Sequence, residues 1–340
     1  MADISPRAVI FGCAGPELSE AERAFFADAD PVGFILFERN CASPEQVRQL
    51  CTDLRASVGR KNTPILIDQE GGRVRRLKPP HWRPAPAARM FADLAKRNPA
   101  AGEEAVRLNA RLMAAELADL GIDVDCTPVL DLPQDDADPI IGDRAYGTEP
   151  AMVARLARAV GEGLVAGGVL PIIKHIPGHG RARADSHKEL PRVEVSHAEL
   201  SAHDFRPFRD LCDLPMAMTA HVVFEAIDAA VPATCSRRLI DTVIRGEIGF
   251  DGWLISDDLS MKALSGGFAD RARAALDAGC DVVLHCSGDL AEMYSVVSGT
   301  RRLDPAGMDR LNRARALIAG PTAAFDNLAA ETRLAALLDQ

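Results

Sequence analysis

The chain lacks the features that mark membrane, exported and nucleic-acid-binding proteins. Its longest apolar stretch, Leu164 to Ile173, covers ten residues, about half of the ~20 that a membrane helix needs. The N-terminus has no basic stretch followed by an apolar core and a cleavage site, so we expect no export signal and a mature protein that is the whole chain. With 39 basic and 49 acidic residues the net charge is −10, and such a surface repels phosphate backbones and anionic lipids. We therefore expect neither a nucleic acid nor a membrane as a partner.

Signatures of disulfide frameworks, cysteine metal sites and nucleotide loops are also missing. The eight cysteines are scattered without CxxC or CxxxC spacing, which predicts reduced, mostly buried thiols in a cytoplasmic protein. Neither GxGxxG nor GxxxxGK[ST] occurs. The composition, with 47% hydrophobic and 26% charged residues, is that of an ordinary globular protein. It excludes a disordered chain, a coiled coil and a collagen-like repeat. A length of 340 residues is within the range of a single α/β barrel.

Short runs of aliphatic and β-branched residues recur along the chain, each bounded by Gly, Pro, Asp or Asn. They are apolar throughout and do not alternate with polar residues, which is typical of parallel strands buried on both faces. The predicted strands are Ala8–Cys13, Val32–Phe37, Pro64–Asp68, Ile122–Thr127, Val169–Lys174, Pro215–Ala220, Gly252–Ser256 and Asp281–Cys286.

Helical patterns fill the intervals between these runs. Apolar residues step by three or four along 106–120 and 153–164, as one face of a helix requires, and capping boxes at Ser19, Ser43 and Ser196 predict three further helix starts. Repeated strand-helix units predict an α/β fold, a single (β/α)₈ TIM-type barrel spanning residues 1–340, with an open doubly wound sheet as the alternative. The tail, 304–340, predicts two helices packed on the barrel's outside.

Polar residues follow several predicted strands, where the loops of a barrel converge over one mouth and form its active site. After the third strand, Asp68 and Glu70 precede two glycines and three arginines, the last of them Arg76. This pattern favours a site for a polyhydroxylated or anionic ligand, with a surface salt-bridge cluster as the alternative. In the long loop after the fourth strand, Arg144 either clamps ligand oxygens or pairs with a nearby acid.

The densest group follows the fifth strand. Lys174, His175, His179 and His187 fall within fourteen residues, and a metal site of the three histidines is one interpretation. A proline and two glycines prevent the helix that HxxxH ligation needs, so we favour another. In it Lys174 and His175 donate to sugar hydroxyls, His179 braces the turn, and Asp185 with His187 forms a dyad on a loop that can swing. The aspartate fixes the imidazole's tautomer and favours its protonated form, which suits a general acid near neutral pH, whereas a solvated histidine beside an aspartate is the simpler alternative.

Two adjacent carboxylates, Asp257 and Asp258, end the seventh strand. If strand geometry persists they point in opposite directions, so only one of them faces the mouth. A carboxylate there, across from a mobile proton donor, suits double displacement at an anomeric carbon through a covalent glycosyl-enzyme.

Taken together and in order, these motifs resemble the bacterial β-N-acetylglucosaminidases of glycoside hydrolase family 3, of the single-domain type used in peptidoglycan recycling. The resemblance covers about residues 8 to 290. The sequence departs from it in Gln69, where many relatives have histidine, and in Tyr146, where phenylalanine is commoner. The motifs that carry it are Asp68-x-Glu70-Gly-Gly-Arg73-Val-x-Arg, Ile141-Gly-Asp143-Arg144-x-Tyr146-Gly, Lys174-His175-Ile-Pro-Gly-His179-Gly, Asp185-x-His187 and Ser256-Asp257-Asp258-x-Ser-Met261.

The resemblance implies a retaining exo-β-N-acetylglucosaminidase that uses no metal and no cofactor. Asp257 is then the nucleophile, and the Asp185–His187 dyad is the acid/base, in place of the carboxylate that larger relatives take from another domain. The implied substrate is a muropeptide, N-acetylglucosamine linked to 1,6-anhydro-N-acetylmuramic acid with or without stem peptide, and we expect a monomer. The residues implied to hold the N-acetylglucosamine unit are Asp68, Arg76, Arg144, Lys174 and His175.

Other functions stay open on the sequence alone. The substrate's own acetamido group can replace the protein nucleophile. A neutral imidazole does not repel phosphate, so the same site can serve a phosphorylase. From a different class, the barrel can be a sugar-binding protein without catalysis.

Overall fold

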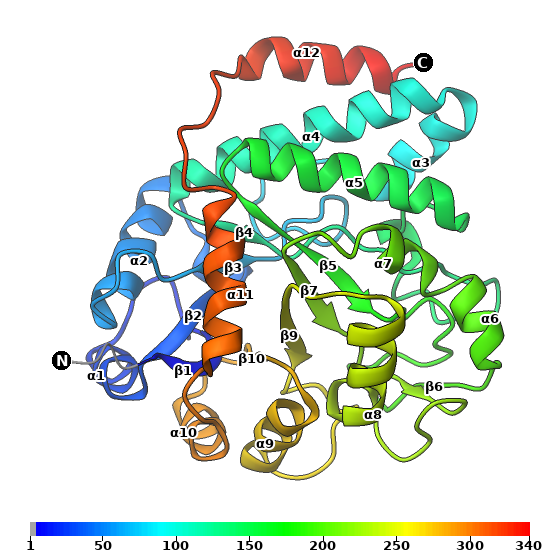
Figure 1. Cartoon of the computed structure of the whole chain (residues 1–340). Helices are drawn as coiled ribbons and strands as arrows, with labels where there is room; N and C mark the ends of the chain where they lie inside the picture. The colour runs from blue at the N-terminus through cyan, green and yellow to red at the C-terminus, as the bar shows by residue number, and fades with distance from the viewer. Residues whose placement is uncertain (1–4) are drawn as a thin grey trace.

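The chain folds as a closed barrel of parallel strands, which a computed structural model describes for residues 5–340 (Figure 1). Residues 1–4, the start of the segment in which we expect no export signal, lie outside the described part. Around the barrel the strands follow the order β1-β10-β9-β7-β5-β4-β3-β2, which confirms the (β/α)₈ TIM-type barrel and excludes the open sheet. The barrel strands are β1 (Arg7–Gly12), β2 (Pro31–Leu36), β3 (Ile65–Ile67), β4 (Val124–Asp125), β5 (Leu170–Ile176), β7 (Met216–Thr219), β9 (Trp253–Asp258) and β10 (Val282–His285).

Each predicted strand is present, but the lengths differ where the backbone leaves the ladder. The fourth is much shorter than the predicted Ile122–Thr127, because the Thr127 N–H turns back to the Asp125 carbonyl at 2.8 Å and Pro128 has no N–H to donate. By contrast β5 continues to Ile176 and β9 to Asp258. Both extensions carry polar side chains from the buried barrel wall to its mouth.

Helices surround the barrel, as the periodicity predicts. Along residues 5–340 none of them combines the length and apolar character needed to cross a membrane. They are α1 (Glu20–Ala29), α2 (Pro44–Ser57), α3 (Ala88–Arg97), α4 (Pro99–Leu120), α5 (Pro150–Ala166), α6 (His197–Ala202), α7 (Arg206–Asp210), α8 (Arg237–Leu239), α9 (Phe268–Ala278), α10 (Leu290–Gly299), α11 (Pro305–Ala316) and α12 (Asn327–Leu338), with short 3₁₀ turns at Glu38–Asn40, Gly142–Arg144 and Ala233–Cys235 and a π-helical stretch at Ile240–Glu247.

The three predicted helix starts are correct, but only one is a full capping box. Ser19 caps α1 with the reciprocal bond in place. Ser43 and Ser196 each accept the backbone N–H three residues on, at α2 and α6. The expected return bonds are absent because Gln46 accepts a backbone N–H from the residue before the cap, and Glu199 pairs with an arginine. Single caps satisfy one orphan N–H each, which suffices to start these helices.

The two C-terminal helices pack in different places: α11 contacts the barrel strand β9, whereas α12 lies outside, against α4 and α3. In Figure 1 α12 (red) runs along α4, where Arg333 donates two hydrogen bonds to Glu104, at 2.7 and 2.8 Å. The proline-rich loop before α3 carries Trp82, whose side chain is buried in the hydrophobic core.

A second, two-stranded sheet was not predicted from the sequence. It pairs β6 (Arg192–Val193) with β8 (Val223–Phe224) in parallel. Because β6 follows the loop after β5, this small sheet fixes the far end of the segment that carries Asp185 and His187.

Candidate active site

One cavity of about 270 Å³ is surrounded by the carboxyl ends of the barrel strands and the loops that follow them. The predicted site residues Asp68, Arg76, Arg144, Lys174, His175, His187 and Asp257 all line it. Asp185 does not, and reaches the cavity through its contact with His187. Residues from the ends of four strands, or from the loops that follow them, therefore converge over one opening, as the barrel geometry requires.

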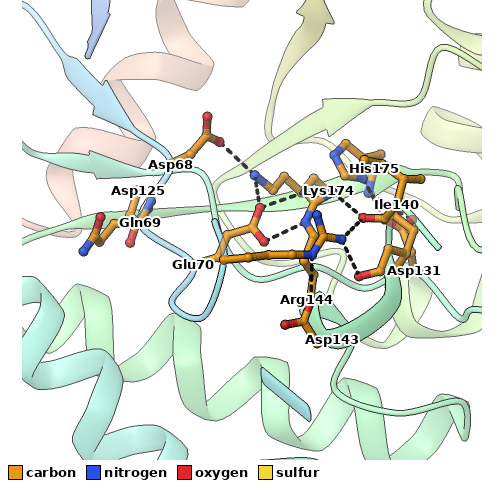
Figure 2. A network of polar contacts seen from close by, with 12 residues as sticks. Asp68, Gln69, Glu70, Asp125, Asp131, Ile140, Asp143, Arg144, Lys174 and His175 are labelled. Carbon is orange, nitrogen blue, oxygen red and sulfur yellow. Dashed lines mark hydrogen bonds and ion pairs between the residues drawn. The ribbon is translucent and has the colours of Figure 1, made fainter. Parts of the chain in front are cut away.

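A buried network of ion pairs forms one wall of the cavity (Figure 2). Lys174, at the end of β5 and only 2% exposed, places its Nζ 2.9 Å from Asp68 and 2.7 Å from Glu70. Arg144 donates two parallel hydrogen bonds to Glu70, both 2.8 Å, and Arg76 donates one to Asp68 at 2.9 Å. Two carboxylates and three cations leave one positive charge in excess. Such a wall offers both donors and acceptors to a polyhydroxylated ligand.

The network keeps both of its carboxylates ionised. Burial raises the pKa of Asp68, but Lys174 and Arg76 outweigh burial and hold it far below its ordinary value. Burial also opposes ionisation of Glu70, and here Arg144 and Lys174 lower the pKa to about 2. Burial alone would lower the pKa of Lys174, yet the two carboxylates raise it above the usual value. All these groups are therefore charged at neutral pH, and Asp68 acts as an acceptor only.

A buried aspartate organises the turn after β5. Asp131 Oδ2 accepts the Nδ1–H of His175 at 2.7 Å, and its Oδ1 accepts the backbone N–H groups of His175 and His179 at 3.2 and 2.6 Å. With Nδ1 occupied by the carboxylate, Nε2 is the nitrogen of His175 that is free to meet a ligand.

The two adjacent carboxylates at the end of β9 both line the cavity, so the expectation that only one of them faces the mouth is wrong, but their surroundings differ. Both carboxylate oxygens of Asp258 accept hydrogen bonds from neighbouring residues. Oδ1 accepts the N–H groups of Ser260 and Cys286 at 3.0 and 3.1 Å, and Oδ2 accepts the Ser260 hydroxyl. Asp257 accepts one hydrogen bond, from the Asp258 N–H at 2.8 Å, through Oδ1. Among residues 5–340 no hydrogen bond reaches its Oδ2, which leaves that oxygen available at the cavity.

Neighbouring imidazoles favour the ionised form of Asp257. Burial raises its pKa, but His221, His175 and the Asp258 N–H outweigh burial and bring the pKa below its ordinary value. His221 is itself fixed, since Nδ1 contacts the Thr234 hydroxyl at 2.7 Å and Nε2 donates to the Asp258 carbonyl at 3.0 Å. Asp257 is thus an ionised carboxylate held on a rigid strand end.

The loop after β5 carries the predicted dyad. Asp185 Oδ1 lies 2.9 Å from His187 Nδ1 and also accepts the His187 backbone N–H at 2.9 Å. Burial raises the pKa of Asp185, while the bonds from His187 outweigh burial and lower it, so the carboxylate stays ionised beside the ring. The His187 side chain is 62% exposed, at the opening of the cavity.

The three histidines considered as metal ligands each have a different partner. His175 is bound to Asp131, His179 Nε2 lies 3.3 Å from the Ser186 hydroxyl, and His187 is bound to Asp185. Over the described residues no three His, Cys, Asp or Glu side chains gather as a metal-binding group. The histidines are arranged as separate hydrogen-bonding groups.

Sequence reasoning gave no site role to several residues that build this site. Glu70 belongs to the predicted ligand-binding pattern without a role of its own, and Asp131 and His221 receive no role, although each closely follows a predicted strand. Gln69, which departs from the resemblance, accepts the N–H groups of Arg76 and Leu77 at 2.9 and 3.1 Å and so shapes the loop that carries Arg76. A position just after a strand was the available signal, but it does not say which partner a side chain will find.

Comparisons with known proteins agree with this architecture. The model of the glycosyl hydrolase family 3 N-terminal domain matches residues 8–316. A beta-hexosaminidase of Bordetella avium is 38% identical, with 97% of this chain and 93% of the relative covered, and one of Alkalilimnicola ehrlichii is 42% identical, with 82% and 80% covered. The crystal structure of NagZ from Neisseria gonorrhoeae in complex with N-trifluoroacetyl-D-glucosamine superposes with a TM-score of 0.88 at 33% identity, covering 98% of this chain and 99% of that one.

Fold and site together define a glycoside hydrolase built on a (β/α)₈ barrel. The chain belongs to glycoside hydrolase family 3. Within that family it is a β-N-acetylhexosaminidase similar to NagZ, as the sequence resemblance predicts.

Proposed function

We propose that the protein is a retaining exo-β-N-acetylglucosaminidase of cell-wall recycling. Its substrate would be a peptidoglycan fragment with a terminal non-reducing N-acetylglucosamine on 1,6-anhydro-N-acetylmuramic acid, with or without stem peptide. The observation that carries the mechanism is the free oxygen of Asp257 at a cavity whose opening holds the His187 imidazole. We further propose that the chain acts as one catalytic barrel domain, as a monomer, in the cytoplasm.

The first chemical step joins the sugar to the protein. Asp257 Oδ2 attacks C1 of the bound sugar, and the C1–O bond to the aglycone breaks as the bridging oxygen takes the Nε2 proton of His187. The products are a glycosyl-Asp257 ester, a neutral imidazole and the released alcohol. The ionised Asp185 stabilises the imidazolium before the step and fixes Nδ1 as the protonated nitrogen after it.

The second step reverses the proton's path. Neutral His187 takes a proton from a water molecule, the water oxygen bonds to C1, and the bond between C1 and Asp257 breaks. Carboxylate and imidazolium are both restored, and two inversions at C1 give net retention. One exposed ring serves both steps because its Nε2 gives a proton in the first and takes one in the second.

The charged wall supplies the sugar site in this proposal. Asp68 accepts from ring hydroxyls, while Lys174, Arg76 and Arg144 donate to oxygens, and His175 Nε2 completes the set. Ligand pockets span about 300–1,000 Å³, so a cavity of about 270 Å³ lies just below that range. This size favours one terminal sugar unit over a long chain, in keeping with an exo-acting enzyme.

Trapping of the intermediate tests this proposal. A 2-fluoro analogue of the sugar with a good leaving group should leave a mass adduct on the peptide that contains Asp257, and NMR should show the β-anomer of N-acetylglucosamine as first product. An α-anomer would refute the retaining mechanism. A β-anomer formed without any covalent adduct would favour assistance by the substrate's acetamido group instead.

A further inference from the structure

The segment that carries the dyad has few connections to the barrel. Between residues 184 and 190 most hydrogen bonds are internal, running from His187, Lys188 and Glu189 back to Asp185. In the part of the chain that the structure describes, both hydrogen bonds that join this segment to the rest of the barrel come from one residue, Ser186. Between the ends of this segment, hydrogen bonds thus attach the dyad to the scaffold through Ser186 alone.

Ser186 is placed between the two members of the dyad and has the opposite exposure to His187. It is only 3% exposed, whereas the His187 side chain is 62% exposed. Its hydroxyl lies 3.3 Å from His179 Nε2, and its carbonyl accepts the Ala263 N–H, from the loop after β9, at 3.2 Å. A buried serine thus ties the loop after β5 to the β9 side of the mouth, where Asp257 stands.

His179 is itself immobile, so it can act as the fixed end of this contact. Its N–H donates to the buried Asp131 at 2.6 Å, and the following Gly180 is packed so closely that an added Cβ would lie 2.1 Å from the Leu132 carbonyl oxygen. The His179 ring is 3% exposed, and burial lowers its pKa to about 4, so it is neutral at pH 7. A neutral ring can either donate to a serine hydroxyl or accept from it.

We propose that Ser186, held by His179, is a positioning residue that sets the place of the Asp185–His187 acid/base over the cavity. The proposal rests on the acid/base role given to His187 above. Ser186 touches no reacting atom in it. Its contribution is to restrict a loop that otherwise samples many positions, which keeps His187 Nε2 within reach of the bridging oxygen.

The test separates proton donation from the rest of catalysis by the choice of leaving group. A phenyl β-N-acetylglucosaminide needs the proton from His187, whereas the 2,4-dinitrophenyl glycoside leaves without it. With kcat/KM as the measure, Ser186→Ala should lose about tenfold on the phenyl substrate, the worth of one hydrogen bond, and about twofold or less on the dinitrophenyl substrate. Loss of the same factor on both substrates, or on neither, would overturn the proposal.

A double-mutant cycle makes the assignment specific. If Ser186 acts only through His187, then Ser186→Ala adds no further loss on the phenyl substrate in the His187→Ala background. An additive loss would instead mean that Ser186 supports the fold or the sugar site, and would refute a positioning role. His187→Ala alone reports on the parent proposal: without a leaving-group effect in that variant, the acid role itself fails.

Two further variants complete the design. His179→Met removes the contact with Ser186 but keeps the backbone bond to Asp131, and it should show the same leaving-group effect, so the proposal stays testable should Ser186→Ala fold poorly. Arg183→Ala is the matched control, since it removes an ion pair of the same loop, to Asp136, in which both side chains are exposed. We expect its kcat/KM to be unchanged on both substrates, and a leaving-group effect there would show that the loop's general mobility, rather than Ser186, sets the position of His187.

Discussion

Exchange of the adjacent carboxylates Asp257 and Asp258 for asparagine is the most direct test of the mechanism. The two side chains sit one residue apart on β9, have the same chemistry, and differ in what they bind. Asp258 accepts three hydrogen bonds from Ser260 and Cys286, while Asp257 accepts one and keeps Oδ2 free. Comparing Asp257→Asn with Asp258→Asn therefore separates a nucleophilic role from a structural one, because each exchange keeps the size and shape of the side chain.

The structure gives the size of each effect. In Asp258→Asn the amide oxygen still accepts both backbone N–H groups, and the Ser260 hydroxyl can reverse its role and accept from the new NH₂. The cost is then about one hydrogen bond, about 0.5–1.5 kcal/mol, so kcat/KM should fall about tenfold or less. In Asp257→Asn the attacking oxygen is lost, and kcat/KM should fall by about 10³-fold or more, which is about 4 kcal/mol of transition-state stabilisation.

Alanine variants extend the comparison to stability. Asp258→Ala leaves two backbone N–H donors without partners at the mouth, at about 1–3 kcal/mol each, so its unfolding midpoint should drop by several degrees while activity survives in part. Asp257→Ala frees only the Asp258 N–H, so it should stay within about 2–4 °C of the parent midpoint and yet be inactive.

Steady-state kinetics on an aryl β-N-acetylglucosaminide, with thermal unfolding followed by circular dichroism, measure all four variants. Tandem mass spectrometry of the 2-fluoro adduct then locates the labelled carboxylate within the peptide. The reasoning is refuted if Asp258→Asn is the inactive variant and Asp257→Asn retains activity, or if the label lies on Asp258.

Three further predictions follow from the same site. His187→Ala should lose about 10²–10⁴-fold in kcat/KM on natural linkages and much less with a good leaving group, and equal losses would reject the acid role. The pKa of Glu70 is lowered to about 2, so its contribution of about 3 kcal/mol to the free energy of unfolding is fully present above pH ~4.5 and is lost as the pH falls through about 2. Urea unfolding between pH 5 and 2 should therefore show a free energy of unfolding that decreases as the pH falls, and Lys174→Met should make this dependence on pH less steep. An unchanged slope would show that Lys174 does not hold Glu70 ionised. Finally, phosphate buffer should yield free N-acetylglucosamine and no sugar 1-phosphate, because the proposed second step uses water; accumulation of the phosphate ester would make phosphorolysis the better description.

Local sequence signals predict the barrel well because each strand and helix is encoded within its own few residues. Both-face burial makes each barrel strand an apolar run, and the 3.6-residue period marks α4 and α5 regardless of what they pack against. The errors occur where a polar group of the backbone or of a side chain has two possible partners. Thr127 bonds back to Asp125 and shortens β4, and Glu199 prefers an arginine to its own helix start.

The site is predictable to the extent that its residues follow strands directly. Asp257 and Lys174 end strands, and a barrel brings strand ends together whatever the loops do. Which charged side chains pair with one another depends on the distances between them across the mouth of the barrel, and no sequence pattern gives these distances. Glu70 lies 74 positions from Arg144 and 104 from Lys174, and only the folded chain shows that it binds both cations. The sequence therefore predicts which charged residues line the cavity, but not the ion pairs and hydrogen bonds between them.

The two halves of the site differ in rigidity, and this difference follows from their chemistry. In the proposed sugar site the buried carboxylates of Asp68 and Glu70 stay ionised because Lys174, near the end of a strand, places its ammonium group within 3 Å of both. In the proposed mechanism the His187 imidazole meets the bridging oxygen in the first step and, on the same side of C1, a water molecule in the second, so it needs one position over the cavity that solvent can reach. An exposed His187 on a loop attached through Ser186 meets both demands, because the anchor limits the range of motion and the ring stays open to solvent.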